Sequence, residues 1–280
     1  MANGHALVLG GGGVAGIAWV TGLLAGLAEA GQDVTDADVV IGTSAGANVA
    51  AQLGSGLSLE ELFARQVDPA LQSRELMAVI DWEKFGADVQ SYMAGATTPT
   101  EQLRGFGRFA LDADTVPEPK RIAVIESRLP SREWPAKPTK LTAIDCASGE
   151  LTVFDAAAGV SLVDAVAASS AVPGIWPPVT IDGRRYMDGG VRSADNADLA
   201  AGAARITVIS PLGMDSPLPT PMPLREVLAG LKDGGASVTL ISPDEASAAA
   251  IGVNALDPAT RVPAATAGRA QGRAGLPPEF

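Results

Sequence analysis

The stretch Val40–Gly46 reads VIGTSAG, a short apolar run that ends in the pattern G-x-S-x-G. In this pattern a strand turns sharply into a helix, and the turn exposes the serine hydroxyl. We therefore expect a buried strand over Val39–Gly42, a turn at Ser44 and a helix over residues 45–53. The turn makes Ser44 a candidate nucleophile, whose usual partner is a histidine base oriented by an acid.

The single histidine of the chain, His5, does not suit this role. We expect the first strand over Ala6–Gly10, which places His5 at its start, as a solvated residue. Five strand residues at about 3.3 Å each separate His5 from the far end of the strand by roughly 16 Å. A base must lie within hydrogen-bonding reach of the hydroxyl, so Ser44 requires a carboxylate if it is catalytic.

A glycine-rich segment, Gly10–Gly13, follows the first strand and opens an apolar helix expected over Val14–Ala30. Apolar strands that alternate with helices indicate a parallel sheet covered on both faces. In such a sheet, Gly10–Gly13 and Ser44 emerge at the same carboxyl edge. Glycines allow several backbone N–H groups to point to one place, as an oxyanion hole requires. The predicted donors are the N–H groups of Gly11, Gly12, Gly13 and Ala45.

The same glycines allow a second interpretation. Gly11-x-Gly13-x-x-Gly16 matches the dinucleotide-binding fingerprint, which makes a nucleotide-binding oxidoreductase the alternative function. That fingerprint requires an acid at the far end of the second strand. The nearby acids all precede Val39–Gly42 instead, and they are Asp33, Asp36 and Asp38. A non-catalytic interaction domain is a third, less favoured class.

Further apolar segments complete the predicted sheet. Two hairpins are expected, one of which turns at Asp182-Gly183, and two more strands are each followed by proline. The strands are expected over residues 140–146, 150–155, 179–181, 184–188, 205–210 and 238–242. Ser161 is expected to cap a helix that reaches about Ala171.

Residues 55–135 form a helical, cap-like section. Ser58-x-x-Glu61 is a capping box, and Ser73 and Thr100 are candidate caps of further helices. The apolar residues of this section either pack its own helices on the sheet or cover the active site. A tail over residues 257–280 is expected to be a surface helix with a loose end. No repeat or linker divides the chain, so we expect a single domain over residues 1–280.

Composition limits the classes of partner. The 280 residues are 47% hydrophobic and 19% charged, which is typical of a globular protein, and the net charge of −12 opposes binding to nucleic acid. The lone Cys146 suits a reducing compartment, and we expect a cytoplasmic protein. Four glycines interrupt the uncharged run over residues 6–28, so neither an integral membrane segment nor a signal peptide is expected. No His/Cys cluster suggests a metal, and no cofactor is expected.

Asp188 is the best candidate for the base. It ends a hairpin strand in the segment RRYMDGG and precedes two glycines, which allow close approach of the backbone. Asp145, at the end of KLTAIDC, is the nearest competitor, whereas Asp182 is more simply a turn residue.

With these segments in order, the chain resembles the patatin-like phospholipase family. The matching pieces are the glycine loop Gly10–Gly13, the nucleophile motif Gly42–Gly46 and the D-G-G motif Asp188–Gly190. Residues 167–174 also resemble the family's segment upstream of that aspartate. The resemblance implies a three-layer α/β/α sandwich with a mostly parallel central sheet. It also implies hydrolysis of acyl esters by a dyad of Ser44, the nucleophile, and Asp188, the base.

Two positions differ from the family pattern. Ala15 stands where the family commonly has Lys or Arg, and Asn196-Ala197 stands where it often has Asn-x-Pro. The expected function is a lipid acyl hydrolase, of the phospholipase A or lysophospholipase-like esterase type. Ala15 leaves open whether the substrate is a phospholipid or a neutral ester. Transient contact with a lipid surface would depend on apolar residues in 55–135, and the oligomeric state stays open.

Overall fold

The fold is known from a computed structural model that describes residues 4–78, 80–215, 220–277 and 279. Within these residues, eight strands form one sheet in the order β5-β6-β3-β2-β1-β7-β8, and β4 pairs with β3 off this path. The strands are β1 (His5–Leu9), β2 (Val39–Gly42), β3 (Thr139–Asp145), β4 (Leu151–Phe154), β5 (Val179–Ile181), β6 (Arg184–Asp188), β7 (Arg205–Ile209) and β8 (Ser237–Ile241). β3, β2, β1, β7 and β8 run parallel, whereas β4, β5 and β6 add antiparallel pairs.

Ten α-helices and three short 3-10 helices accompany the described strands. The α-helices are α1 (Gly13–Glu29), α2 (Ala45–Leu53), α3 (Leu59–Val67), α4 (Trp82–Met93), α5 (Pro99–Asp112), α6 (Glu118–Arg128), α7 (Leu162–Ser169), α8 (Leu224–Asp233), α9 (Glu245–Ile251) and α10 (Arg261–Arg273). The 3-10 helices are η1 (Gly189–Val191), η2 (Ala197–Ala200) and η3 (Pro258–Thr260). The predicted strands, the two hairpins and the helix after Ser44 are confirmed to within about two residues, a normal margin for element ends.

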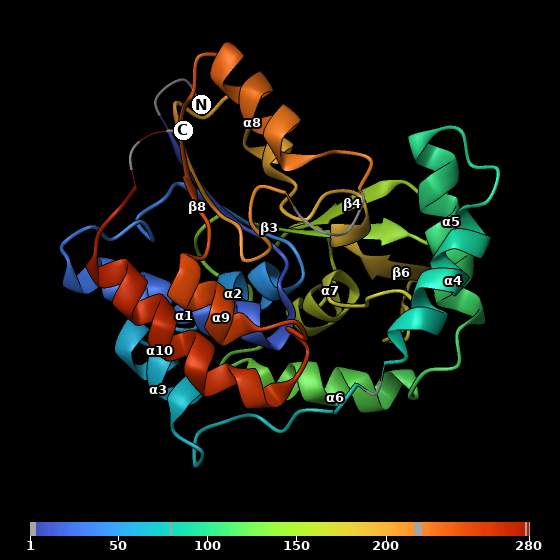
Figure 1. The fold of residues 1–280 in the computed structure, drawn as a ribbon, viewed down its shortest axis with the longest axis horizontal. Helices are drawn as coiled ribbons and strands as arrows, with labels where there is room; N and C mark the ends of the chain where they lie inside the picture. Colours follow the sequence, from blue (N-terminus) through green and yellow to red (C-terminus); the bar gives the residue numbers. More distant parts are fainter. Residues whose placement is uncertain (1–3, 79, 216–219, 278, 280) are drawn as a thin grey trace.

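Alternate residues of each strand face two different layers of helices. In β1, Leu7 and Leu9 belong to the core that includes α1, α2, α7 and α10. Ala6 and Val8 belong to the core that includes α8 and η2 on the opposite face. Figure 1 shows the sheet between α8 and the group of α1, α9 and α10. The predicted three-layer α/β/α sandwich is therefore confirmed.

Helix α10 is more than the loose surface helix that the sequence predicted. It lies across α1 (Figure 1), and small residues let the two backbones meet. A Cβ added at Gly22 would lie 2.0 Å from the Ala265 carbonyl oxygen, and one at Gly268 would lie 2.3 Å from that of Trp19. The predicted surface helix with a loose end is present, since α10 ends at Arg273 and the described residues after it form no helix or strand. The sequence did not reveal that the alanines and glycines of α10 form a packing surface.

The section from 55 to 135 is helical, but two of its caps differ from the prediction. The capping box at Ser58 is present. Thr98, not Thr100, caps α5, because Pro99 occupies the first helical position and Glu101 completes a capping box with Thr98. Ser73 caps no helix; it lies in an extended segment, where its carbonyl accepts a hydrogen bond from Arg261.

His5 is buried, contrary to the expectation that it would be solvated. Its Nε2 lies 3.0 Å from the Thr207 hydroxyl, because β7 pairs with β1 and covers it. Burial also lowers the pKa of His5. Its position at the start of β1, away from Ser44, is as predicted. Among the described helices, none has the length and hydrophobicity needed to cross a bilayer.

Candidate active site

Ser44 occupies a strained turn between β2 and α2. Its φ of 55° and ψ of −111° are rare for a residue with a side chain, and such strain costs about 1–3 kcal/mol. The neighbouring glycines make the turn possible. A Cβ at Gly46 would lie 1.9 Å from the Leu9 carbonyl oxygen, and one at Gly42 would lie 2.7 Å from Ala47 Cα. The turn is secured by a hydrogen bond of 2.9 Å from the Ser44 N–H to Ser169 Oγ.

The glycine loop lies beside this turn, because β1 and β2 are parallel neighbours. The Gly46 N–H donates to the Gly10 carbonyl at 3.0 Å, and a Cβ at Gly11 would lie 3.6 Å from Ser44 Cβ. Of the four predicted oxyanion donors, Gly11 is engaged, since its N–H donates to the Ala194 carbonyl at 2.8 Å. No described residue accepts a hydrogen bond from the N–H of Gly12, Gly13 or Ala45.

Asp188 reaches the same edge of the sheet from β6. Gly42 pairs with Leu141 of β3, and Asp188 pairs with Ala143 of β3, so Asp188 lies just beyond the level where β2 ends. The turn after it is tight, because Gly189 packs on Thr142 so closely that a Cβ would lie 2.3 Å from its hydroxyl oxygen. The Gly190 N–H donates to Asp188 Oδ1 at 2.7 Å.

The Asp188 carboxyl is buried, with 3% of its surface exposed. Burial raises its pKa to about 7, although hydrogen bonds from Ser44 and from the Gly190 N–H, and the positive charge of Arg121, all act to lower it. A general base is most effective when its pKa lies near the working pH. The environment therefore gives Asp188 a pKa suited to proton transfer with the serine hydroxyl at neutral pH.

Asn196 connects the two turns, a role that the sequence analysis did not assign to it. Its Nδ2 donates to the Thr43 hydroxyl at 3.1 Å and to the Gly189 carbonyl at 3.2 Å. These residues precede Ser44 and follow Asp188, so Asn196 holds the ends of β2 and β6 at a fixed separation. Its left-handed φ of 49° is one that asparagine tolerates better than most residues. The only sequence signal was its place in the family pattern.

A second buried carboxyl, that of Asp195, lies under the glycine loop. A Cβ at Gly10 would lie 1.9 Å from Asp195 Oδ1, so this position accepts only glycine. Burial raises the pKa of Asp195 to about 7. The carboxylate therefore packs against Gly10, and neither of its oxygens has a hydrogen-bond partner among the described residues.

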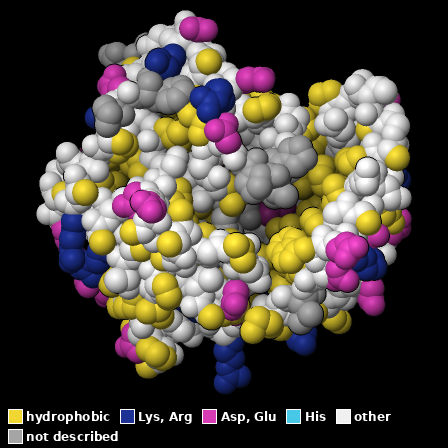
Figure 2. Space-filling view, viewed as in Figure 1, with side chains coloured by type: hydrophobic (Ala, Val, Ile, Leu, Met, Phe, Trp, Pro, Cys, Tyr) yellow, Lys and Arg dark blue, Asp and Glu magenta, His cyan; other side chains and the backbone are white. Residues whose placement is uncertain are grey.

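A pocket opens at Ser44, and arginine side chains line its far wall. Arg121 and Arg128 come from α6, and Leu76 and Glu75 come from the extended segment before α4. Figure 2 shows that the surface is hollowed beside α4 and α5 and that hydrophobic side chains gather there. Neither the arginines nor Glu75 carried a recognisable motif in the sequence.

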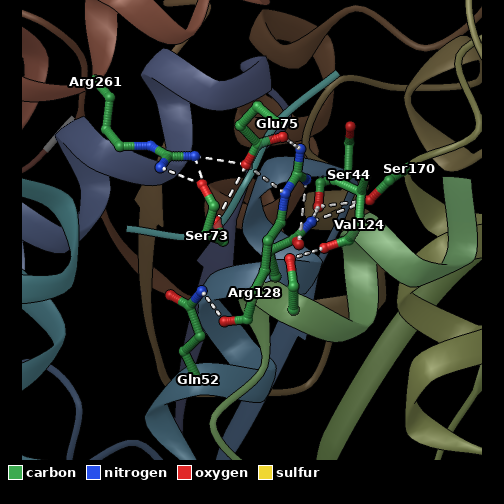
Figure 3. A network of polar contacts seen from close by, with 10 residues as sticks. Ser44, Gln52, Ser73, Glu75, Val124, Arg128, Ser170 and Arg261 are labelled. Carbon is green, nitrogen blue, oxygen red and sulfur yellow. Dashed lines mark hydrogen bonds and ion pairs between the residues drawn. The ribbon is translucent and has the colours of Figure 1, made fainter. Parts of the chain in front are cut away.

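Glu75 organises this wall by binding two arginines at once. Its carboxylate accepts hydrogen bonds from Arg128 Nη2 at 2.6 Å and Arg128 Nε at 2.9 Å, and from Arg261 Nη2 at 2.5 Å. Figure 3 shows Glu75 between the two guanidinium groups, with Arg128 extending toward Ser44 and Ser170. Although burial acts to raise the pKa of Glu75, the arginine charges outweigh it, and the pKa is lowered.

The competing acids lie elsewhere. Asp145 accepts hydrogen bonds from Arg184 at 2.8 Å and from the N–H of Ser148 at 2.7 Å, so it stabilises the β3–β4 hairpin. Asp38 accepts from the His5 N–H at the start of β1, at the edge of the sheet opposite the glycine loop. No cluster of metal-ligating side chains occurs in the described part of the chain. Cys146 is buried, and burial raises its pKa to about 12.

The family described as patatin-like phospholipase matches residues 7–201. No curated protein sequence matches the chain significantly.

Among solved structures, VipD from Legionella pneumophila is similar at 14% identity and a TM-score of 0.47, with 96% of this chain and 66% of VipD covered. The type III effector protein ExoU is similar at 17% identity and a TM-score of 0.37, with 100% of this chain and 55% of ExoU covered. The chain therefore spans less than two-thirds of the length of either protein.

Proposed function

The chain belongs to the patatin-like phospholipase family, and from this premise we propose that it is a lipid acyl hydrolase with Ser44 as nucleophile and Asp188 as base. One observation carries the proposal. Burial raises the pKa of the Asp188 carboxyl to about 7, and Ser44, which lowers that pKa as a hydrogen-bonding partner, lies at the same edge of the sheet. A serine on a strained strand-to-helix turn with a base in contact is the arrangement that activates a weak nucleophile.

In the first step, Asp188 accepts the hydroxyl proton while Ser44 Oγ attacks the carbonyl carbon of an ester. The tetrahedral intermediate carries a negative charge on the former carbonyl oxygen. The N–H groups of Gly12, Gly13 and Ala45 are free to bind this oxygen, whereas that of Gly11 is bonded to Ala194. Loss of one such donor typically costs about 3–4 kcal/mol of transition-state stabilisation.

In the second step, protonated Asp188 gives its proton to the leaving alcohol, and the C–O bond of the ester breaks. Asp188 then takes a proton from water, which attacks the acyl-serine, and returns this proton to Ser44 Oγ as the acyl–oxygen bond breaks and the fatty acid leaves. The same carboxyl thus acts as base and acid, which a pKa near neutrality allows in both directions.

Labelling and hydrolysis together test this dyad. We expect an active-site fluorophosphonate to label the wild-type protein, and Ser44→Ala to abolish labelling. Ser131→Ala is the control, because its hydroxyl lies in an exposed loop, where it accepts a hydrogen bond from the Glu133 N–H. Asp188→Asn should abolish hydrolysis of p-nitrophenyl esters, whereas Asp145→Asn should not. Normal turnover by Asp188→Asn would refute the dyad.

We further propose that the section over residues 55–135 covers the site and contacts the lipid surface. Leu76 and Arg121 of this section line the pocket at Ser44. Large hydrophobic side chains of the section also face solvent, with Met77 67% exposed and Trp82 52% exposed.

The test of this contact is co-sedimentation with phosphatidylcholine vesicles. Met77→Glu and Trp82→Glu should each lower the bound fraction several-fold. Val253→Glu is the matched control, because Val253 is fully exposed and lies outside residues 55–135. Equal binding by all variants would contradict the contact.

A further inference from the structure

Arg121 is buried with hydrogen-bonding capacity that the protein does not use. Its side chain is 4% exposed, and no described residue bonds to its Nε or Nη1. Native proteins pair nearly all buried polar groups, so an unpaired guanidinium requires an explanation. The explanation is suggested by its position, because Arg121 lines the same pocket as Ser44.

The charges around Arg121 leave it without a committed counter-ion. Glu75 is already bound by Arg128 and Arg261. Asp188 is the remaining acid that acts on Arg121, and its pKa of about 7 leaves it partly protonated at neutral pH. Burial and the neighbouring Arg128 lower the pKa of Arg121 to about 9, so it stays positively charged at neutral pH. A chain of net charge −12 has thus buried an excess of positive charge at one place.

Trp176 fixes the orientation of this charge. The guanidinium carbon of Arg121 lies 3.9 Å from the centroid of the Trp176 ring, which also lines the pocket. Stacking covers one face of the guanidinium and holds its plane, while the N–H groups remain at the edge. A planar fork of donors matches two oxygens of a phosphate or carboxylate.

We propose that Arg121 binds an anionic group, a phosphate or carboxylate, that the substrate carries close to the scissile ester. This assignment rests on the proposed function and adds to it the substrate class, an anionic acyl ester. The wall formed by α1 brings no charge to the pocket, since its lining residues are Gly13, Val14 and Ile17. The cation for an anionic substrate therefore comes from α6.

A purely electrostatic role for Arg121 makes a different prediction. Arg121 lowers the pKa of Asp188, so its loss would change the pH profile equally for every ester. An anion-binding role acts only on substrates that carry the anion. The ratio of kcat/KM for an anionic ester to that for a neutral ester separates the two, because the effect on Asp188 cancels in the ratio.

The experiment compares a 1-acylglycerol 3-phosphate with the 1-acylglycerol of the same chain, both below their critical micelle concentrations. We expect Arg121→Gln to lower the anionic-to-neutral ratio of kcat/KM at least tenfold, mainly through KM. Arg121→Lys should retain part of the ratio, because it keeps the charge but not the fork. Arg132→Gln should leave it unchanged, since Arg132 is 70% exposed and pairs with Glu126. A ratio within twofold of wild type in Arg121→Gln would overturn the proposal.

A binding measurement keeps the proposal testable if the dyad fails. Calorimetry with Ser44→Ala should detect dodecyl phosphate, with at least tenfold weaker binding in Ser44→Ala/Arg121→Gln. Equal binding by the two proteins, or none by either, would overturn the anion site. Inorganic phosphate binding as tightly as dodecyl phosphate would overturn the assignment to a substrate. Failure of fluorophosphonate labelling with intact dodecyl phosphate binding would refute the proposed function alone.

Discussion

The two walls of the pocket at Ser44 are built in opposite ways. One wall consists of turns that follow β1 and β2, with Asp188 of β6 beside them, and each turn comes from a short local motif. The other consists of charged side chains from α6 and from the segment before α4, and its Glu75 is bound from outside the pocket by Arg261, 186 residues away. The first wall holds a carboxylate, Asp188, whose pKa burial raises, and the second holds Glu75, whose pKa arginines lower. Reactive and structural carboxylates thus differ in their partners more than in their burial.

Among the variants that test this difference between the walls, Asp188→Asn should have the largest effect on hydrolysis. We expect hydrolysis to fall by about 10⁴-fold, the order of loss seen when a catalytic acid–base group is removed. Stability should change in the opposite direction. The folded pKa of about 7 lies above the unfolded value near 4, so ionising Asp188 opposes folding, and this cost is full above pH 7.

Urea unfolding tests the stability part. We expect Asp188→Asn to be more stable than wild type by up to about 4 kcal/mol at pH 8, with the difference vanishing toward pH 4. A loss of stability at pH 8 would show that ionised Asp188 is stabilised by its partners, as Glu75 is.

Glu75→Gln, in contrast, should lower the free energy of unfolding. Removing one partner of a buried ion pair typically costs about 3–5 kcal/mol, and here two arginines lose their carboxylate. Because the folded pKa of Glu75 is lowered, its stabilisation is present above the unfolded pKa and is lost as the pH falls through the folded pKa. Unfolding midpoints at pH 4 and pH 7 measure this. Glu133→Gln, in an exposed loop, is the control.

Gly22→Ala tests whether the site depends on the packing of α1 on α10. The added Cβ would meet the Ala265 carbonyl, and such overpacking typically costs about 1–3 kcal/mol. Helix α1 begins at Gly13, so we also expect slower fluorophosphonate labelling. Gly86→Ala in α4 is the matched control, because a Cβ there meets open space and should stabilise the helix by about 0.5–1 kcal/mol.

The smallest expected effect is that of Arg121→Gln on the pKa of Asp188, which links the two walls of the pocket. Arg121 lowers the pKa of Asp188, so Arg121→Gln should raise that pKa. The pH profile of kcat/KM for a neutral ester rises on its acidic side as Asp188 loses its proton, because the base must be deprotonated. In Arg121→Gln we therefore expect this rise to occur at higher pH. An unchanged pH profile in Arg121→Gln would mean that the two walls act independently.

The sequence predicted the wall that is built from local turn motifs, but not the wall that is built from distant charged residues. The turn at Ser44 and the hairpin that ends at Asp188 depend on glycines and strand alternation within a few residues, and these segments were predicted almost to the residue. Arg121 and Glu75 look like ordinary charged residues of a helix and a loop. Only the packing of α6, α10 and the segment before α4 makes them neighbours, so no local pattern could identify them.

The errors have a similar cause. His5 was expected in solvent because nothing near it in the sequence indicates that β7 pairs with β1. The helix of the tail was predicted but its packing on α1 was not, because alanine and glycine carry little local signal, although between helices they permit the closest contacts. Burial by distant segments is the information that a single sequence lacks.

The contact of α10 with α1 also bears on how the chain acquires its shape during synthesis. Arg269 binds Glu29, a residue made 240 positions earlier, and β7, the other neighbour of β1, is likewise translated late. Most of the polypeptide therefore leaves the ribosome before α10 is available to cover the apolar face of α1. Non-local contacts of this kind slow folding and leave hydrophobic surface exposed. We expect nascent chains that end before α10 to bind chaperones and to lack esterase activity.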